Sequence, residues 1–301
     1  IVPVQGITAR SFIFRLMGNR VGDSKIAYIS STYVPLVGSS SRPVRMFVLL
    51  LCCVGLAEDG SRSADSLIMR GIDILNSSYN EWDNGGFQKA ARVFGRAADQ
   101  ENTGGLAEYW IGTSLFFQAI YHLYTPDKAP EQIKGKSYID RGIEVLGTAV
   151  ARKPDFSESY AVRGVLRGMK ISMNPVSVFT QGPLVGKDRD KALALNAGNP
   201  RVHFLTGVSF WYSPRILGNY GKALPHFLTA DTLFEKESRM RKDPLYPRWG
   251  RSMNAAFIGE VYFAEEEYTA AKNYYQAALA VNESDSLAKR GMEKINELNR
   301  K

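Results

Sequence analysis

The chain has 301 residues, of which 45% are hydrophobic and 23% charged, an ordinary composition for a folded globular protein with ample material for a core. Its formal net charge of +8 is uneven, because residues 1–57 hold six basic side chains and one acidic one. In the remainder, basic and acidic residues are interspersed rather than gathered on one face, so we expect no nucleic-acid partner. The two cysteines, Cys52 and Cys53, are adjacent and fit neither a metal site of known spacing nor a disulfide framework.

The first part of the chain carries no folding pattern. It begins with Ile1, and residues 1–45 alternate short apolar runs with Gly and Ser without a sustained period. We interpret residues 1–45 as an unstructured or mis-assigned N-terminal extension.

Residues 46–57 have the outline of a secretory signal peptide. The apolar run 47–57 is too short to span a bilayer as a helix, Arg42 and Arg45 precede it, and it ends in the small-residue pattern Gly55-Leu56-Ala57. We therefore expect cleavage after Ala57 and an exported protein, periplasmic or secreted. A buried hydrophobic element and a lipoprotein signal are the alternatives, and contact with a membrane is expected only if the segment is retained or lipidated.

Residues 58–283 are predicted to form about five helical hairpins. The clearest is residues 251–283, where small and aromatic residues recur at the spacing of two closely packed helices. These are Gly259, Tyr262, Ala271, Tyr275 and Ala278. Residues 199–238 repeat the rhythm with Gly207, Phe210, Ala223, Phe227 and Ala230.

The upstream hairpins are less regular. Residues 67–100 are divided by a predicted turn at Asn84-Gly85-Gly86, and residues 105–154 pair helices predicted at 106–124 and about 136–152. The weakest unit is 155–198, in which residues 172–187 are expected to form a loop over the stack edge, as a lid or as a passive insertion. Residues 125–135 and 239–250 are proline-broken insertions, and 284–301 is predicted to be a charged capping helix.

This pattern resembles the tetratricopeptide repeat, whose small and aromatic positions the last unit matches, departing only at Glu283. Residues 199–283 also resemble the C-terminal half of a group of exported bacterial repeat proteins. The matching motifs are Asn199-Pro200-Arg201, Tyr212-Ser213-Pro214, Gly218-Asn219 and Pro247-Arg248-Trp249-Gly250. The resemblance implies an all-α fold, a right-handed superhelical stack of antiparallel helix hairpins (an α-solenoid) with a concave surface.

No catalytic set is visible, so we expect no enzyme activity, no cofactor and no metal. His122, His203 and His226 stand alone in the sequence, without a zinc-binding spacing. His203 and His226 fall on the two helices of one unit and could approach each other, but packed histidines are the preferred interpretation.

The resemblance also implies which side chains line the concave groove, because positions 2, 5, 9 and 12 of each first helix face it in the family. In the second unit these are Leu106, Tyr109, Thr113 and Phe116. In the fourth and last units they are Arg201, Phe204, Val208, Trp211, Met253, Ala256, Glu260 and Phe263. The set is aromatic and apolar, and Arg201 is its only basic member.

Two functions fit these positions. The first is a non-enzymatic scaffold that binds a protein or peptide partner in the groove. The alternative is a carrier of a small apolar ligand that is associated with a solute-transport system. The aromatic side chains could also be covered by the insertions of the chain itself.

Overall fold

The computed structural model describes residues 63–100, 103–125, 129–213, 220–240, 243–298 and 300. The predicted extension 1–45 and signal segment 46–57 lie outside the described residues. The compact unit Ser63–Lys301 contains helices and connecting segments, and no strand among its described residues. No described helix is long and apolar enough to cross a membrane.

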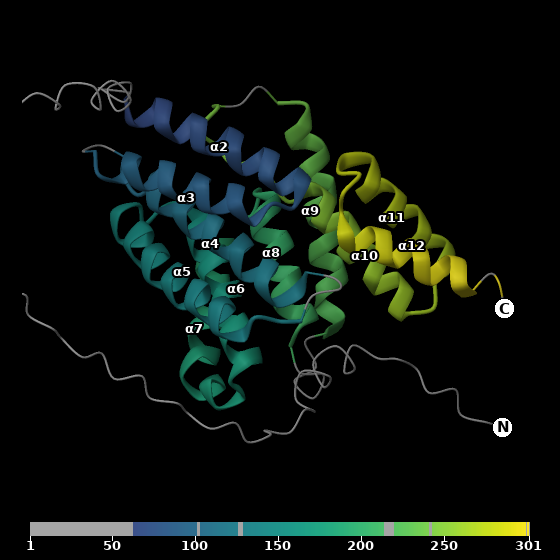
Figure 1. Ribbon diagram of the computed structural model, residues 1–301. Coiled ribbons are helices and arrows are strands. Elements are labelled where there is room, and N and C mark those ends of the chain that lie inside the picture. The colour runs from purple at the N-terminus through teal and green to yellow at the C-terminus, as the bar shows by residue number, and fades with distance from the viewer. Residues whose placement is uncertain are drawn as a thin grey trace, which may run out of the picture. The chain divides into compact units, whose positions relative to one another are not determined.

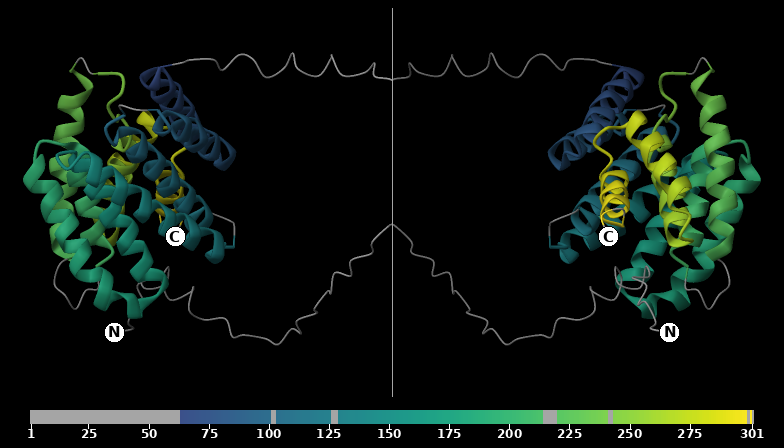
Figure 2. Two further views of the ribbon diagram at one scale, coloured as in Figure 1. Left: turned by 90° about the vertical axis from the view of Figure 1, so that its left-hand side faces the viewer. Right: turned by 90° about the vertical axis from the view of Figure 1, so that its right-hand side faces the viewer.

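The helices follow one another as antiparallel hairpins (Figure 1). The first three hairpins are α2 (Ala64–Glu81) with α3 (Asn84–Ala98), α4 (Leu106–Tyr124) with α5 (Gln132–Arg152), and α6 (Ser157–Met173) with α7 (Val178–Leu195). The last two are α8 (Pro200–Trp211) with α9 (Ala223–Ser238) and α10 (Arg251–Ala264) with α11 (Tyr268–Val281), followed by α12 (Ser286–Leu298). Short 3-10 turns, η1 (Pro175–Ser177) and η3 (Tyr220–Lys222), precede α7 and α9. Figure 2 shows successive hairpins packed side by side, so the predicted stack of helix hairpins is confirmed.

Glycines allow the two helices of a hairpin to approach closely. A Cβ atom added to Gly207 would lie 2.5 Å from the ring of Phe227, and one added to Gly259 would lie 2.6 Å from the ring of Tyr275. Both distances are shorter than a carbon–carbon contact allows, because non-bonded carbons sit about 3.5–4.0 Å apart. The small/aromatic rhythm of the sequence therefore marks packing contacts inside each hairpin.

Two predicted segments differ from the structure. Asn84-Gly85-Gly86 is the first turn of α3 rather than the turn itself, because the Asp83 carboxylate caps the helix by accepting from Gly85 N at 2.9 Å and Gly86 N at 2.8 Å. Residues 172–187, expected as a loop, are largely helical: α6 continues to Met173 and α7 begins at Val178 with Pro183 inside it. Pro183 removes only one helical hydrogen bond, and it lies on an exposed stretch where water can satisfy the carbonyl that is left.

The first and last hairpins also meet. Tyr79, near the end of α2, lies against Ser252 at the start of α10 and Asn282 before α12, and burial raises its pKa well above the usual tyrosine range. One hydrophobic core runs from α2 to α10, and a smaller one joins α10, α11 and α12. The first helices of the five hairpins are α2, α4, α6, α8 and α10. The surface that they turn toward the inside of the stack is called the inner face below.

Candidate functional site

A segment of the chain itself crosses part of the inner face. Residues 243–250, called the strap below, connect α9 to α10 without forming a helix. The indole Nε1 of Trp110 on α4 donates to the carbonyl oxygen of Leu245 at 3.3 Å. The ring of Tyr246 meets that of Phe156 edge-on with centroids 6.1 Å apart. The strap then turns into α10 at Gly250, whose φ of +106° lies in the region that favours glycine.

Trp249 is the large buried side chain of the strap, with 5% of its surface exposed. Its ring packs edge-on against Phe117 of α4 at 5.5 Å and Phe204 of α8 at 6.4 Å between centroids. Its Nε1 donates to the hydroxyl oxygen of Tyr109 at 3.0 Å. Trp249 therefore bridges the second and fourth hairpins through both apolar and polar contacts.

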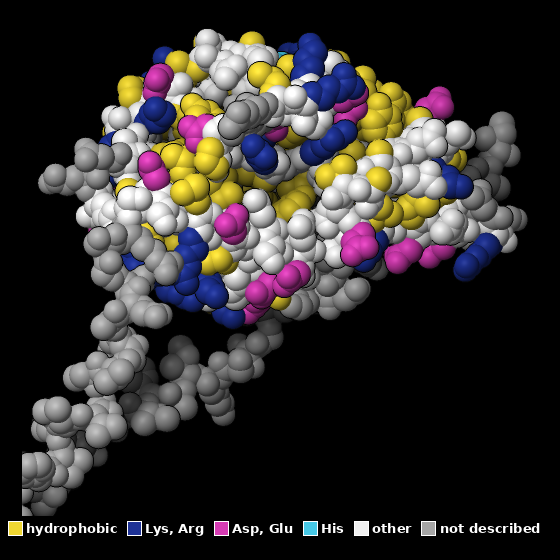
Figure 3. All heavy atoms as spheres, turned by 90° about the horizontal axis from the view of Figure 1, so that it is seen from above, with side chains coloured by type: hydrophobic (Ala, Val, Ile, Leu, Met, Phe, Trp, Pro, Cys, Tyr) yellow, Lys and Arg dark blue, Asp and Glu magenta, His cyan; other side chains and the backbone are white. Residues whose placement is uncertain are grey.

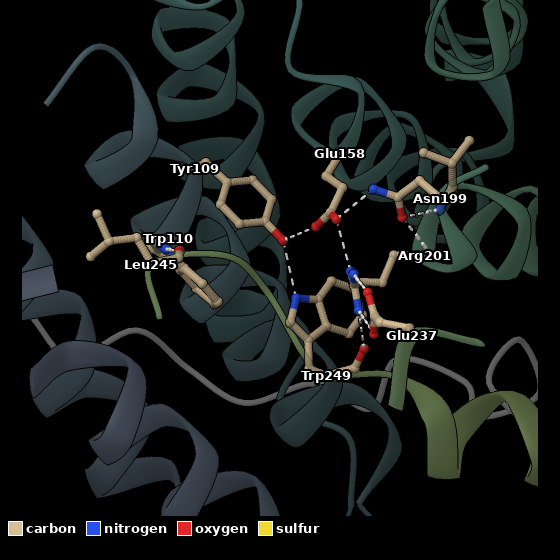
Figure 4. Close-up of polar contacts among 9 residues, drawn as sticks. Tyr109, Trp110, Glu158, Asn199, Arg201, Glu237, Leu245 and Trp249 are labelled. Atoms are coloured by element: carbon tan, nitrogen blue, oxygen red, sulfur yellow. Dashed lines mark hydrogen bonds and ion pairs between the residues drawn. The ribbon is translucent and has the colours of Figure 1, made fainter. Parts of the chain in front are cut away.

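A buried polar network lies beneath Trp249 (Figure 4). The carboxylate of Glu158 on α6 accepts from Tyr109 Oη at 2.6 Å, from Asn199 Nδ2 at 2.7 Å and from Arg201 Nε at 2.8 Å. Burial and the charge of Glu158 raise the pKa of Tyr109, so its hydroxyl stays protonated and donates. The network ties α4 and α6 to the start of α8.

Arg201 completes the network toward the strap and α9. Its two terminal nitrogens form a bidentate pair with the carboxylate of Glu237, one bond being 3.0 Å long. The same guanidinium donates to the carbonyl oxygen of Trp249 at 3.3 Å. A buried guanidinium needs several acceptors in fixed positions, and here two carboxylates and one carbonyl supply them.

Most of the residues predicted to line the groove are buried in the structure. Tyr109, Thr113, Phe116, Arg201, Phe204 and Val208 are each 8% exposed or less. Tyr109, Phe116, Arg201 and Phe204 contact Trp249 of the strap, and Thr113 bonds to the carbonyl oxygen of Tyr109 in its own helix. Because all six are buried, they do not line an open groove in this structure. Leu106 is partly buried and Ala256 fully buried. Burial by an insertion, the third possibility raised by the sequence, applies to the residues that contact Trp249.

Trp211, Met253, Glu260 and Phe263 remain partly exposed. The residue beside Trp211, Tyr212, is 50% exposed, and its ring lies 6.2 Å from that of Phe257. Burial of its hydroxyl end raises the pKa of Tyr212 above the usual tyrosine range, and Tyr124 on α4, Glu260 on α10 and Arg290 on α12 act on the same hydroxyl. We call Tyr124, Trp211, Tyr212, Glu260 and Phe263 the open part of the inner face.

Glu260 and Phe263 are held in place by the last two helices. Tyr275 Oη of α11 donates to Glu260 Oε1 at 2.7 Å, and Lys294 Nζ of α12 lies 3.6 Å from the same oxygen. Lys294 also stands over the ring of Phe263, 5.3 Å from its centroid. Burial and the neighbouring Glu260 raise the pKa of Tyr275 far above its usual range, so this hydroxyl remains a donor.

The histidines form packing contacts. His203 and His226 meet through their Nδ1 atoms at 3.1 Å, and His203 Nε2 lies 2.9 Å from the carbonyl oxygen of Ala197. A carbonyl can only accept, so Nε2 of His203 carries hydrogen and, in the neutral ring, its Nδ1 accepts from His226. The described residues contain no group of three side chains that could hold a metal ion.

Sequence reasoning missed Glu158, Glu237 and Trp249 as partners of the predicted positions. Glu158 lies six residues before Gly164, as Arg201 lies six before Gly207, so the two occupy equivalent repeat positions with opposite charges. Opposite charges at equivalent repeat positions could have predicted the pairing of Glu158 with Arg201 from the sequence. Nothing in the sequence places Glu237, on a second helix, against Arg201.

Figure 3 views the molecule from above. This face has a hollow with hydrophobic side chains at its bottom and Lys and Arg side chains nearby.

No protein-family model and no curated protein matches the sequence. Among solved structures, the chain is similar to the HusA haemophore from Porphyromonas gingivalis, with 22% identity, a TM-score of 0.55, and coverage of 69% of this chain and 96% of that one. It is also similar to a chain of the Cut9–Hcn1 hetero-tetramer of the APC/C, with 18% identity, a TM-score of 0.53, and coverage of 79% and 37% respectively. These likenesses establish a fold of the tetratricopeptide-like helical repeat type, and at these identities they establish the fold alone.

Proposed function

We propose that this helical repeat protein is a non-enzymatic scaffold that binds a protein or peptide partner through the open part of its inner face. The observation that carries the proposal is Tyr212. Its side chain is 50% exposed although its ring lies against Phe257 of α10 and its hydroxyl end is buried near Glu260 and Arg290.

Such a surface has the composition of an interaction site. Exposed Tyr and Trp side chains bury much apolar area with few rotatable bonds and keep a polar group for orientation, so they dominate the binding energy of many interfaces. Trp211 and Phe263 are further partly exposed aromatic side chains of the open part. Because these side chains stand on packed helices, a partner would meet a surface that is already ordered.

The strap indicates how a partner would bind. An extended segment with Pro244 and Pro247 already occupies the neighbouring part of the inner face, held by its carbonyl oxygens at Leu245 and Trp249 and by one buried indole. The inner face is therefore suited to extended, aromatic-containing chain. We propose that a partner segment extends along the open part in the same manner.

A peptide display library selected on the protein tests this proposal. We expect enriched peptides with aromatic residues, and we expect Tyr212→Glu to weaken their binding at least about tenfold, as loss of an interface hot spot does. Met240→Glu, at an exposed site after α9, is the matched control and should bind as the wild type does. Equal binding by the Tyr212→Glu variant would place the site elsewhere.

A second candidate function is a carrier of a small apolar ligand. Two observations favour it: the similarity to HusA, which is described as a haemophore, and the apolar hollow in Figure 3. Titration with haemin, followed by absorption spectroscopy and native mass spectrometry, separates the two functions. A saturable one-to-one complex favours the carrier, whereas only non-saturable haemin uptake favours the scaffold.

We also propose that the protein is exported. The support is the signal-like segment 46–57. Intact-mass measurement of protein from its native cells should show a chain that begins near Glu58, and a mature chain that retains Cys52 would contradict this.

A further inference from the structure

The first half of α7 is an apolar element without core contacts. The buried side chains of α7 are Asp188 and Ala192, and η1 buries none. We call residues 175–184 the α7 tip. Within it, Val176 is 74% exposed and Phe179 is 83% exposed, and Val178 and Leu184 are exposed as well. Single exposed apolar residues are common, but four in one short segment mark an interaction site.

Asp188 attaches the second half of α7 to α6. Its carboxylate accepts from Arg163 at 3.0 Å and 2.5 Å and from Arg167 at 2.7 Å, which fixes the second half of α7 to α6. The tip extends beyond this attachment, and in Figure 1 the turn between α6 and α7 lies at the lower end of the helices. The tip is therefore a convex end of a hairpin.

The tip contains little that requires water. Residues 171–186 include no charged side chain. The hydroxyl groups of this stretch donate to nearby backbone carbonyl oxygens: Ser172 to Met169 O at 2.7 Å, Ser177 to Asn174 O at 2.6 Å, and Thr180 to Ser177 O at 3.1 Å. Polar groups that are already hydrogen-bonded cost far less to remove from water than unpaired ones.

Basic side chains lie next to the tip. The α6–α7 hairpin, residues 157–195, holds six basic and three acidic side chains, a net charge of +3. Arg163 and Arg167 pair with Asp188, Lys170 with Asp140 and Arg189 with Asp190. The basic residues are Arg163, Arg167, Lys170, Lys187, Arg189 and Lys191. Lys187, three residues after the tip, is exposed and forms no ion pair or hydrogen bond among the described residues.

We propose that the α7 tip inserts into the interfacial layer of a membrane that contains anionic lipids. A convex apolar tip needs a partner that adapts its shape, and lipid does so without a complementary pocket. The flanking basic charge favours anionic headgroups, and apolar insertion combined with such charge is how peripheral proteins attach to bilayers.

The test is flotation of the full chain with vesicles of phosphatidylcholine and phosphatidylglycerol. We expect the double variant Val176→Asp, Phe179→Asp to lose at least about tenfold in vesicle affinity. Lys187→Gln should lose about fivefold on these vesicles and nothing on phosphatidylcholine alone. Val281→Asp, which changes an exposed residue of α11, should bind as the wild type does.

All variants carry the same residues 1–62, so any lipid affinity of the apolar segment 47–57 is common to them. The substituted side chains are exposed, so circular dichroism and the unfolding midpoint should not change. Equal vesicle binding by the double variant, or no binding by the wild type, would overturn the proposal. So would a wild-type dimer in size-exclusion chromatography that the double variant abolishes, because the tip would then contact a second copy of the chain.

Discussion

Replacing Trp249 by alanine removes the side chain that holds the strap against the inner face. The residue is 5% exposed and packs against Phe117 and Phe204, and loss of a buried aromatic side chain costs about 3–5 kcal/mol. Trp249→Phe keeps a ring but loses the 3.0 Å hydrogen bond to Tyr109, which contributes about 1 kcal/mol. Since Tyr109 still donates to Glu158, the phenylalanine variant leaves no unpaired donor.

Urea unfolding followed by circular dichroism measures both costs. At about 2–4 °C per kcal/mol for a unit of this size, Trp249→Ala should lower the thermal midpoint by about 6–20 °C. In the Trp249→Ala variant the strap should be released, and trypsin should cut it after Arg248 faster than in the wild type. A Trp249→Ala variant that loses less than about 1 kcal/mol and resists trypsin as the wild type does would show that the strap is not bound as described.

Substitutions elsewhere in the stack should also change its stability. Arg201→Ala should cost about 3–5 kcal/mol in urea unfolding, because Glu158 and Glu237 would lose their buried cation. Gly207→Ala should destabilise by about 1–3 kcal/mol through its clash with Phe227, whereas Gly147→Ala, with no atom within 4 Å of the added Cβ, should stabilise by about 0.5–1 kcal/mol. Burial, His203 and Arg189 lower the pKa of His226, so the unfolded chain takes up its proton first as pH falls. Stability should therefore be lost as pH drops below the ordinary histidine pKa of about 6.5, and less steeply in His226→Gln; an equal slope would contradict this.

The helix hairpins could be predicted from the sequence because their signal is local. Gly259 and Tyr275 are close in sequence and in direct contact, so their spacing alone reveals the packing. The first half of the helix at 178–195 was expected as a loop because Gly182 and Pro183 are the usual signs of one, and the exposed position of this turn makes them tolerable in a helix.

The site was harder to predict than the fold. Groove positions could be named from the repeat, but Tyr109 is buried against the strap, which has no repeat of its own. Tyr212 is exposed and is not one of those positions. The bond from Trp249 to Tyr109 joins residues 140 apart in the chain. Such contacts follow from the complete stack and leave no periodic trace in the sequence.

The most direct test of the proposed function is the affinity of the wild type and the Tyr212→Glu variant for one selected peptide, measured by isothermal titration calorimetry. We expect binding with a stoichiometry of one and an affinity at least about tenfold weaker in the variant, with unchanged circular dichroism in both proteins. An unchanged affinity in the folded variant would contradict the claim that the open part of the inner face binds the partner.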